Sequence, residues 1–544
     1  MPTTPSTTQP ATTDESAVVA SLSDEISGLR LDNEKLKGER DQYRRLYLDM
    51  LEMARKLELG IVGRGRERDL GDATPLSLLA LMNGGEAVDP APAAESAKQP
   101  VASHERAKPT GRKPLPEKLP RVTVEVVPDE VQKAGLDAFE RIGEDVSETV
   151  ERRPAAVVVV RTVRPKFVPK GQSRGDETAV HQGEPLELPI PRGLAGPGML
   201  ADTIVRRWAD HTPLHRMERI YGRDGLELAR QTICDWHISL SRLVRPLLDA
   251  MWADALDSPY LCTDATGVLV QHAEKCRNGH FFVVAAPQKH VLFEFSQKHN
   301  GAAVDELLAG YKGVLVADAA TVFDHLYATG DVREAGCWAH TRRYFFKALS
   351  SEPKRARHAL DLIGKLFDEE RKLKGVAPDL RLKVRDVNHR AIVTEFEDWC
   401  DAESLQCVDE SPLAKAIGYA KNQRKALRTF LDDGRVPIDN NWSERELRRI
   451  AWGRDNWLFV GSEDGGDAAA NFVSLIASCQ LHGIEPYAYL RDLLCLLPWW
   501  PKSQVLDLCP AHWAVTSALP DVRQTLADNV FRKVTLGEIE PPRK

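Results

Sequence analysis

Three acidic residues of this chain stand where a divalent cation could use them. Asp264 and Asp318 each follow a short apolar run typical of a buried strand, and Glu444 lies close to several arginines. A carboxylate within a hydrophobic strand is costly unless a charge compensates it, and a divalent cation is the usual compensation. The three acids could therefore form a metal site whose neighbouring arginines face phosphates.

Each acid also has a plain structural interpretation. Asp264 could cap a turn after its strand, and Asp318 could be the N-cap of a helix over 321–327. Glu444 could pair with Arg448 at the i, i+4 spacing of a surface salt bridge. The choice depends on whether the fold brings the three acids together.

A sheet must position the two aspartates. From Asp257 onward the apolar period becomes two, which predicts strands. Consecutive strands, a helix and a further strand are the opening of a ribonuclease-H-like fold, in which the end of the first strand lies beside the end of the strand that follows the helix. The expected elements are strands over 260–264, 266–270, 281–286, 291–295 and 313–318, with a helix over 302–311.

A helix must deliver Glu444 to the same place. Pro437 and the Asp/Asn run at 439–441 predict a helix start, and Leu447 and Ile450 then give an apolar edge at helical spacing. The chain between 352 and 435 has an almost wholly helical pattern, so it is expected to be a helical insertion that separates this helix from the strands.

Size and composition limit the class of protein. At 544 residues, 42% of them apolar and 28% charged, the chain is expected to form three or four soluble globular units. Residues 1–16 lack the features of a secretory signal, and no apolar run approaches the roughly 20 residues of a membrane helix. We therefore expect a cytoplasmic, nucleoid-associated protein without membrane contact. The nine cysteines form no CxxC pair and are expected to be reduced.

The region 21–62 has a heptad repeat. Its seam runs from Leu22 to Ile61 in alternating steps of four and three residues, which predicts a coiled coil. With Ile26 at an a position, Asn33 takes the next a position, where a buried amide favours a dimer in register. A parallel homodimer explains this pattern, and a long helix packed on the body is the alternative.

Arg230 and Gln231 belong to a possible DNA-reading helix. Helical patterns over 200–211 and 214–221 precede a longer one from Leu226, with a glycine-bearing turn between the last two. This order suggests a helix-turn-helix, although a small helical bundle without a DNA role would have the same pattern.

Three long stretches resemble the DDE transposases of the insertion-sequence sixty-six family. They are 336–346, which begins Gly-Cys-Trp-Ala-His, then 439–462, which begins Asp-Asn-Asn-Trp-Ser-Glu, and 474–492. The helical segment 201–248 and the start of the coiled coil are also similar. The resemblance thus covers most of the chain.

The resemblance implies a mechanism and a cofactor. Asp264, Asp318 and Glu444 would be the DDE triad, separated by 54 (318 − 264) and 126 (444 − 318) residues. Asp264 would bridge two Mg²⁺ (or Mn²⁺) ions and the other acids would each hold one, so that DNA is cut and its 3′-hydroxyl joined to target DNA. Oxygen-only ligation favours these ions over zinc.

The implied partners are DNA, as transposon ends and target, a second copy of the chain, and two small accessory proteins. His340 is expected near a strand end, either beside the metals or as a core or capping histidine. Trp442, Trp452 and Trp457 are expected in the core. The predicted DNA-binding residues are Arg230, Gln231, Arg342, Arg343, Arg445, Arg448, Arg449 and Arg454.

Two positions depart from the family pattern. Relatives often carry paired cysteines of a zinc-ribbon-like element in the region that corresponds to 130–170, and this chain has none there, so no structural zinc is expected. Many relatives also have Glu directly after the first catalytic Asp, where this chain has Ala265, although the triad itself is retained.

The predicted fold is multidomain α/β, with a ribonuclease-H-like catalytic core that carries a helical insertion. A catalytically inactive DNA-binding relative and a nuclease without strand transfer remain alternatives. The expected order is a disordered start (1–20), the coiled coil (21–62), a basic Pro-rich linker (63–120), a small β unit with a short helix near 130–142 (121–170), a linker (171–196), the helix-turn-helix-like domain (197–256), the core (257–350), the insertion (351–436), the rest of the core (437–483) and a C-terminal region ending in a polar tail (484–544).

Overall fold

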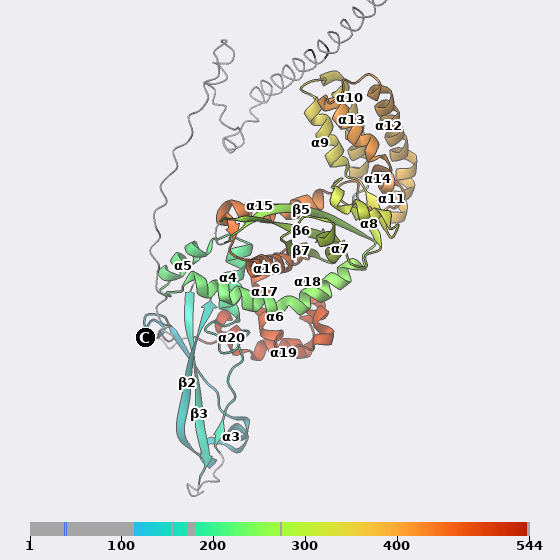
Figure 1. Ribbon diagram of the computed structural model, residues 1–544. Helices are drawn as coiled ribbons and strands as arrows, with labels where there is room; N and C mark the ends of the chain where they lie inside the picture. Colours follow the sequence, from blue (N-terminus) through green and yellow to red (C-terminus); the bar gives the residue numbers. More distant parts are fainter. Residues whose placement is uncertain are drawn as a thin grey trace, which may run out of the picture. The chain divides into compact units, whose positions relative to one another are not determined.

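The computed structural model describes residues 37, 40, 114–153, 156–170, 180–272 and 275–540 (Figure 1). The predicted coiled coil lies outside this part of the chain, except for Lys37 and Arg40, which are helical.

The protein is multidomain and mixed α/β, with two compact units. We call them the helical unit, which contains Thr341–Phe367 and Thr394–Asn422, and the sheet unit, which contains Arg106–His340, Asp368–Val393 and Gln423–Lys544. None of the helices described has the length and apolar composition needed to cross a bilayer.

The sheet unit begins with a long antiparallel hairpin, β2 (Phe139–Arg153) and β3 (Ala156–Pro169). Strands β1 (Arg121–Glu125) and β4 (His181–Gln182) both pair with β3. The short helix α3 covers Asp129–Ala134, so the predicted helix near 130–142 is wrong in its second half. Gly135, at φ 88°, ends the helix in a conformation that favours glycine, and β2 begins soon after.

Three helices follow the hairpin: α4 (Pro197–Trp208), α5 (Leu214–Arg223) and α6 (Arg230–Leu256). The third helix begins at Arg230 rather than at Leu226 as predicted. Leu226 and Leu228 are buried without being helical, and their apolar character extended the pattern past the true helix start.

Asp264 lies within a strand of the second sheet, and Asp318 follows another of its strands by two residues. Its strand order is β7-β6-β5-β8-β9, and β10 also pairs with β5. Strands β5, β8 and β9 are parallel, whereas β6 and β7 are antiparallel additions. The bounds are β5 Tyr260–Val270, β6 Arg277–Ala285, β7 Val291–Ser296, β8 Gly313–Val316, β9 Val332–Ala335 and β10 Phe459–Val460, with helices α7 Gly301–Leu307 and α8 Asp324–Ala328 between them.

Helices α15 (Asn441–Trp457) and α16 (Glu463–Leu481) pack against this sheet. Helix α15 contacts β5 and β6, and α16 contacts β7 and α6. Ser474 and Ser478, one turn apart on α16, accept hydrogen bonds from the backbone N–H groups of Phe293 (2.7 Å) and Val291 (3.1 Å) on β7. These bonds satisfy polar groups of a strand that has only one neighbour in the sheet.

The C-terminal helices are part of the folded body. After α17 (Pro486–Leu496) the chain forms α18 (Pro510–Thr516), α19 (Pro520–Asp528) and α20 (Val530–Leu536). Phe531 and Val534 of α20 join an apolar cluster with Val158 and Val160 of β3. The prediction that this region fades into a polar tail is therefore wrong up to α20.

The chain between the strands and α15 is helical, as predicted. Its helices are α9 (Trp338–Ala348), α10 (Pro353–Lys372), α11 (Pro378–Val384), α12 (Arg390–Ser404), α13 (Pro412–Asn422) and α14 (Arg424–Arg428). Within the helical unit, Phe345 packs against Phe396 and Trp399, with ring centroids 5.6 and 6.0 Å apart. The segment Asp368–Val393 belongs instead to the sheet unit.

Candidate active site

Three parallel strands are in register and align three residues. Cys262 of β5 is paired with Val316 of β8, and Val316 is paired with Ala335 of β9. Two residues beyond these positions stand Asp264, Asp318 and Cys337. Because neighbouring strands lie about 4.8 Å apart, this register sets Asp318 and Cys337, just past the ends of β8 and β9, beside the middle of β5, where Asp264 stands. Asp264 and Asp318 are both half-buried.

Asn440 fastens the start of α15 to this part of the sheet. Its side-chain amide donates to the carbonyl of Thr263 (2.8 Å), directly before Asp264, and its backbone N–H donates to the Cys337 sulfur (3.2 Å). Asn440, Thr263 and Cys337 are all fully buried. Because β8 lies between β5 and β9, Asn440 spans the end of the strand that precedes Asp318. Glu444 follows one helical turn later.

Glu444 lies beside a histidine and a cysteine. Its Oε1 is 3.5 Å from Nδ1 of His340, and these side chains are 20% and 17% exposed. Together with Cys337 they form a group whose candidate ligand atoms all lie within 4.8 Å of one another. Asp264, within β5, and Asp318, two residues after β8, are not members of this group. His340 belongs to the first turn of α9, so the prediction that it lies near a strand end is wrong.

The neighbouring titratable groups show how strongly this corner is desolvated. Burial raises the pKa of the Cys337 thiol to about 11, although backbone N–H groups of Asn440, His340 and Ala339 act in the opposite direction. Burial also raises the pKa of Asp439, and the negative charge of Glu444 adds to this rise. Cys337 is thus a neutral thiol, and negative charge is crowded around Glu444.

The four predicted arginines of α15 differ in their surroundings. Arg445 and Arg448 are exposed. Arg449 pairs with Glu446 (2.7 Å) and also bonds to Gln480. Arg454 donates to the Thr266 hydroxyl (3.3 Å) and to the carbonyl of Gly267 on β5. Arg445 and Arg448 therefore face solvent, whereas Arg449 and Arg454 make hydrogen bonds within the protein.

The remaining predicted DNA-binding residues are at helix starts. Arg230 and Gln231 are exposed at the start of α6, where Gln231 donates to Asp235 (2.9 Å). Arg342 and Arg343 are exposed on α9. Of the three tryptophans expected in the core, Trp457 is buried but Trp452 is 59% exposed. Trp452 lies on the solvent side of α15, so that prediction is wrong for it.

Asn440 and Cys337 were not among the predicted site residues. Cys337 carried a usable signal, because it follows its strand by two residues, as Asp318 does. The sequence signal at Asn440 was weaker, since an Asn before a helix usually indicates only an N-cap. Its side chain instead bonds across to a strand 177 residues earlier, which no local pattern reveals.

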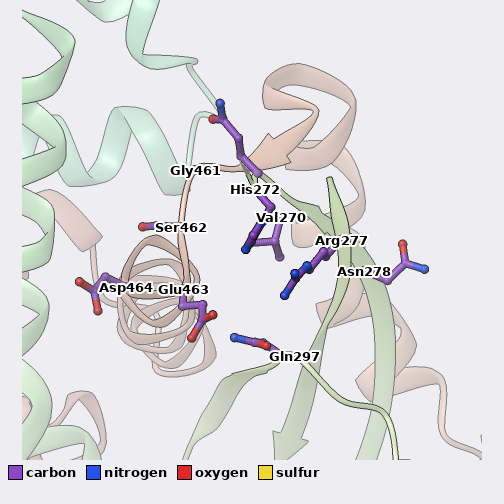
Figure 2. A pocket seen from close by; sticks show the side chains of 10 residues that line it. Val270, His272, Arg277, Asn278, Gln297, Gly461, Ser462, Glu463 and Asp464 are labelled. Atoms are coloured by element: carbon purple, nitrogen blue, oxygen red, sulfur yellow. The ribbon is translucent and has the colours of Figure 1, made fainter. Parts of the chain in front are cut away.

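A cavity of about 490 Å³ lies at the C-terminal end of β5. Figure 2 shows Arg277 and Gln297 close to Glu463, at the start of α16, around this space. The lining residue Val270 is six residues from Asp264, roughly 20 Å along an extended strand. None of the three predicted catalytic acids lines this cavity, so it is a separate feature from the candidate site.

Three protein-family models match this chain. The model described as the Transposase IS66 family matches residues 192–468, and the IS66 C-terminal element matches 474–511. A third, described as the Transposase C of IS166 homeodomain, matches residues 62–124. The first match covers the strands with Asp264 and Asp318 and the helix with Glu444.

Relatives from Sinorhizobium fredii (strain NBRC 101917 / NGR234) extend over most of the chain. The uncharacterized protein y4hP is 29% identical over 493 residues, which cover 85% of this chain and 88% of the relative. The uncharacterized protein y4qI is 31% identical over 423 residues, which cover 74% and 77%. The family assignment of this chain rests on these matches and on the family model that spans the strands and α15. Membership in this family supports a DNA-binding role in transposition. The chain belongs to the IS66 family of transposases.

Proposed function

We propose that this protein is a DDE transposase that cuts DNA at the ends of its insertion sequence and joins the freed 3′-hydroxyl to target DNA. The main support is the register that aligns Asp264 with Asp318, together with the buried bonds of Asn440 that hold the start of the Glu444 helix at the same part of the sheet. The strand order β7-β6-β5-β8-β9 also agrees with a ribonuclease-H-like core.

The donor set fits Mg²⁺ or Mn²⁺. Asp264, Asp318 and Glu444 offer carboxylate oxygens, which these hard cations prefer. The raised pKa of Asp439, caused by burial and by Glu444, shows that negative charge is already costly in this corner. Divalent cations would offset that charge and, when bound, would activate the attacking oxygen and stabilise the leaving one.

The protein's own residues would position the catalytic acids and bind the DNA backbone. Asn440 holds α15 against β5, so that Glu444 keeps its place relative to the aspartates. Arg445 and Arg448, exposed on α15 beside Glu444, would bind backbone phosphates and align the scissile bond. Arg449 and Arg454 form bonds within the protein, so they would stabilise this surface and also contact DNA.

The test uses the full-length chain and labelled DNA that carries the inverted repeats flanking its gene. We expect 3′ nicks at the repeat ends and joined products with Mg²⁺ or Mn²⁺. Asp264→Asn should lower both rates by on the order of 10³-fold or more. Asp455→Asn, which changes an exposed acid on α15, is the matched control and should leave both rates unchanged.

Two results would overturn the proposal. Cleavage without any joined product would favour a nuclease of the same architecture. Binding to the repeat ends without cleavage by any divalent cation would favour a catalytically inactive DNA-binding relative.

A further inference from the structure

His340 has no role in the triad, yet it is a close neighbour of Glu444. It is in the first turn of α9, three residues after Cys337, and Glu444 is in the first turns of α15. Both side chains are mostly buried but retain some exposure, 17% for His340 and 20% for Glu444. Both side chains are therefore partly accessible to solvent.

The separation between the two side chains suits a shared cation. Nδ1 of His340 and Oε1 of Glu444 are 3.5 Å apart, whereas an N–H···O hydrogen bond is usually about 2.7–3.2 Å long. Two atoms that bind one cation at roughly 2.1–2.2 Å each lie about 3.0–3.5 Å from one another. The distance is long for a direct bond and within the range for two ligands of one ion.

Cys337 does not complete a zinc-like ligand set. Its sulfur accepts the backbone N–H of Asn440 at 3.2 Å, and the side chain is fully buried. The Cys337 sulfur is thus engaged in holding the start of α15, so the candidate donors for a cation in this group are the nitrogen of His340 and an oxygen of Glu444.

We propose that His340, through Nδ1, is a direct ligand of the divalent cation held by Glu444, and that this site binds Mn²⁺ in preference to Mg²⁺. This inference rests on the proposed function, because it assigns one more ligand to the same site. Imidazole is a good ligand for transition metals, whereas Mg²⁺ favours oxygen ligands and keeps its water shell. A nitrogen donor therefore shifts the selectivity toward Mn²⁺ without excluding Mg²⁺.

The direct test is pulsed electron paramagnetic resonance of Mn²⁺ bound to the full-length protein. We expect an imidazole ¹⁴N coupling in the native protein that disappears in His340→Gln. The coupling should persist in His325→Gln, which changes a partly exposed histidine bonded to Asp305. Titration with Mn²⁺ should show an affinity loss of about tenfold or more for His340→Gln and a smaller loss for Mg²⁺.

Labelling provides a second measurement that needs no variant. In native protein grown with ¹⁵N-histidine, the ¹⁴N coupling should be replaced by a ¹⁵N coupling, even if His340→Gln does not fold. Bound Mn²⁺ without any histidine coupling would overturn the role of His340 and leave the triad in place. If Asp264→Asn and Glu444→Gln instead left Mn²⁺ affinity unchanged, the proposed metal site itself would be wrong.

Discussion

Two glutamates of the sheet unit differ in how their carboxylates are accommodated. Glu151, near the end of β2, is fully buried, and its Oε1 accepts backbone N–H groups of Arg152 (2.7 Å) and Met199 (2.6 Å). Glu444 remains 20% exposed and faces His340 across 3.5 Å. The first carboxylate is enclosed by backbone of α4, and the second is partly accessible to solvent.

The two glutamates thus differ in access as well as in burial. The space around Glu151 is closed, since a Cβ at Gly196 or at Gly198 would collide with its carboxylate oxygens. Backbone donors there replace water, and no cation or substrate can approach. Glu444 has partial exposure, another acid nearby and exposed arginines on its own helix, and these features suit the proposed phosphate chemistry.

The largest expected effect is a difference in cleavage activity between variants of the two glutamates. Glu444→Gln should reduce cleavage at the insertion-sequence ends by on the order of 10³-fold or more, because it removes a metal-binding oxygen. Glu151→Gln should keep the native rate within about threefold, since Glu151 touches no substrate. Single-turnover cleavage of labelled ends measures both. Equal losses in the two variants would contradict the distinction drawn here.

The second prediction concerns pH. Burial raises the pKa of Glu151 to about 8, from 4.5. Its contribution to stability is therefore fully present below pH 4.5 and is lost as the pH rises through 8. Between pH 5 and 8 the free energy of unfolding should fall by up to about 4 kcal/mol from this group.

Glu151→Gln resembles the protonated acid and should remove most of that fall. Urea unfolding of both proteins at pH 5 and pH 8 measures the difference. A variant that loses stability over this range as steeply as the native protein would show that Glu151 is ionised in the fold.

A smaller effect is expected for the residue that joins Glu444 to the sheet. Asn440→Ala should lower the free energy of unfolding by about 1–3 kcal/mol, because it leaves the buried carbonyl of Thr263 without this donor. It should also lower the cleavage rate of the folded enzyme, since α15 would be less well held. Asn456→Ala, an exposed position on the same helix, should change stability by less than about 0.5 kcal/mol. Thermal unfolding combined with single-turnover kinetics tests both.

The smallest effect is expected from the exposed arginines beside Glu444. Arg445→Gln and Arg448→Gln should each weaken binding to any DNA sequence and lower the slope of log affinity against log salt by about one. Arg523→Gln, on an exposed position of α19, should change neither quantity. Fluorescence anisotropy at several salt concentrations measures the slopes, and unchanged slopes for both α15 variants would exclude these phosphate contacts.

Sequence patterns predicted the strands and the helix that carry the candidate acids. They predicted the contacts between these elements less well. Strands with Asp264 and before Asp318 and a helix with Glu444 follow from local apolar periodicity, and all three are present. The bond from Asn440 to Thr263 and the burial of Glu151 depend on residues far apart in the chain. His340 was expected near a strand end, but β9 ends at Ala335 and α9 already begins at Trp338.

The order of the candidate residues along the polypeptide affects when an active site can exist. Asp264 and Glu444 are separated by 180 residues (444 − 264), and the helical insertion is translated between them. At the usual 5–20 residues per second, a ribosome needs roughly 10–40 s to pass from the first to the second. If the three acids act together, a nascent chain cannot cut DNA during this interval, and truncated translation products would be harmless to the chromosome that encodes them.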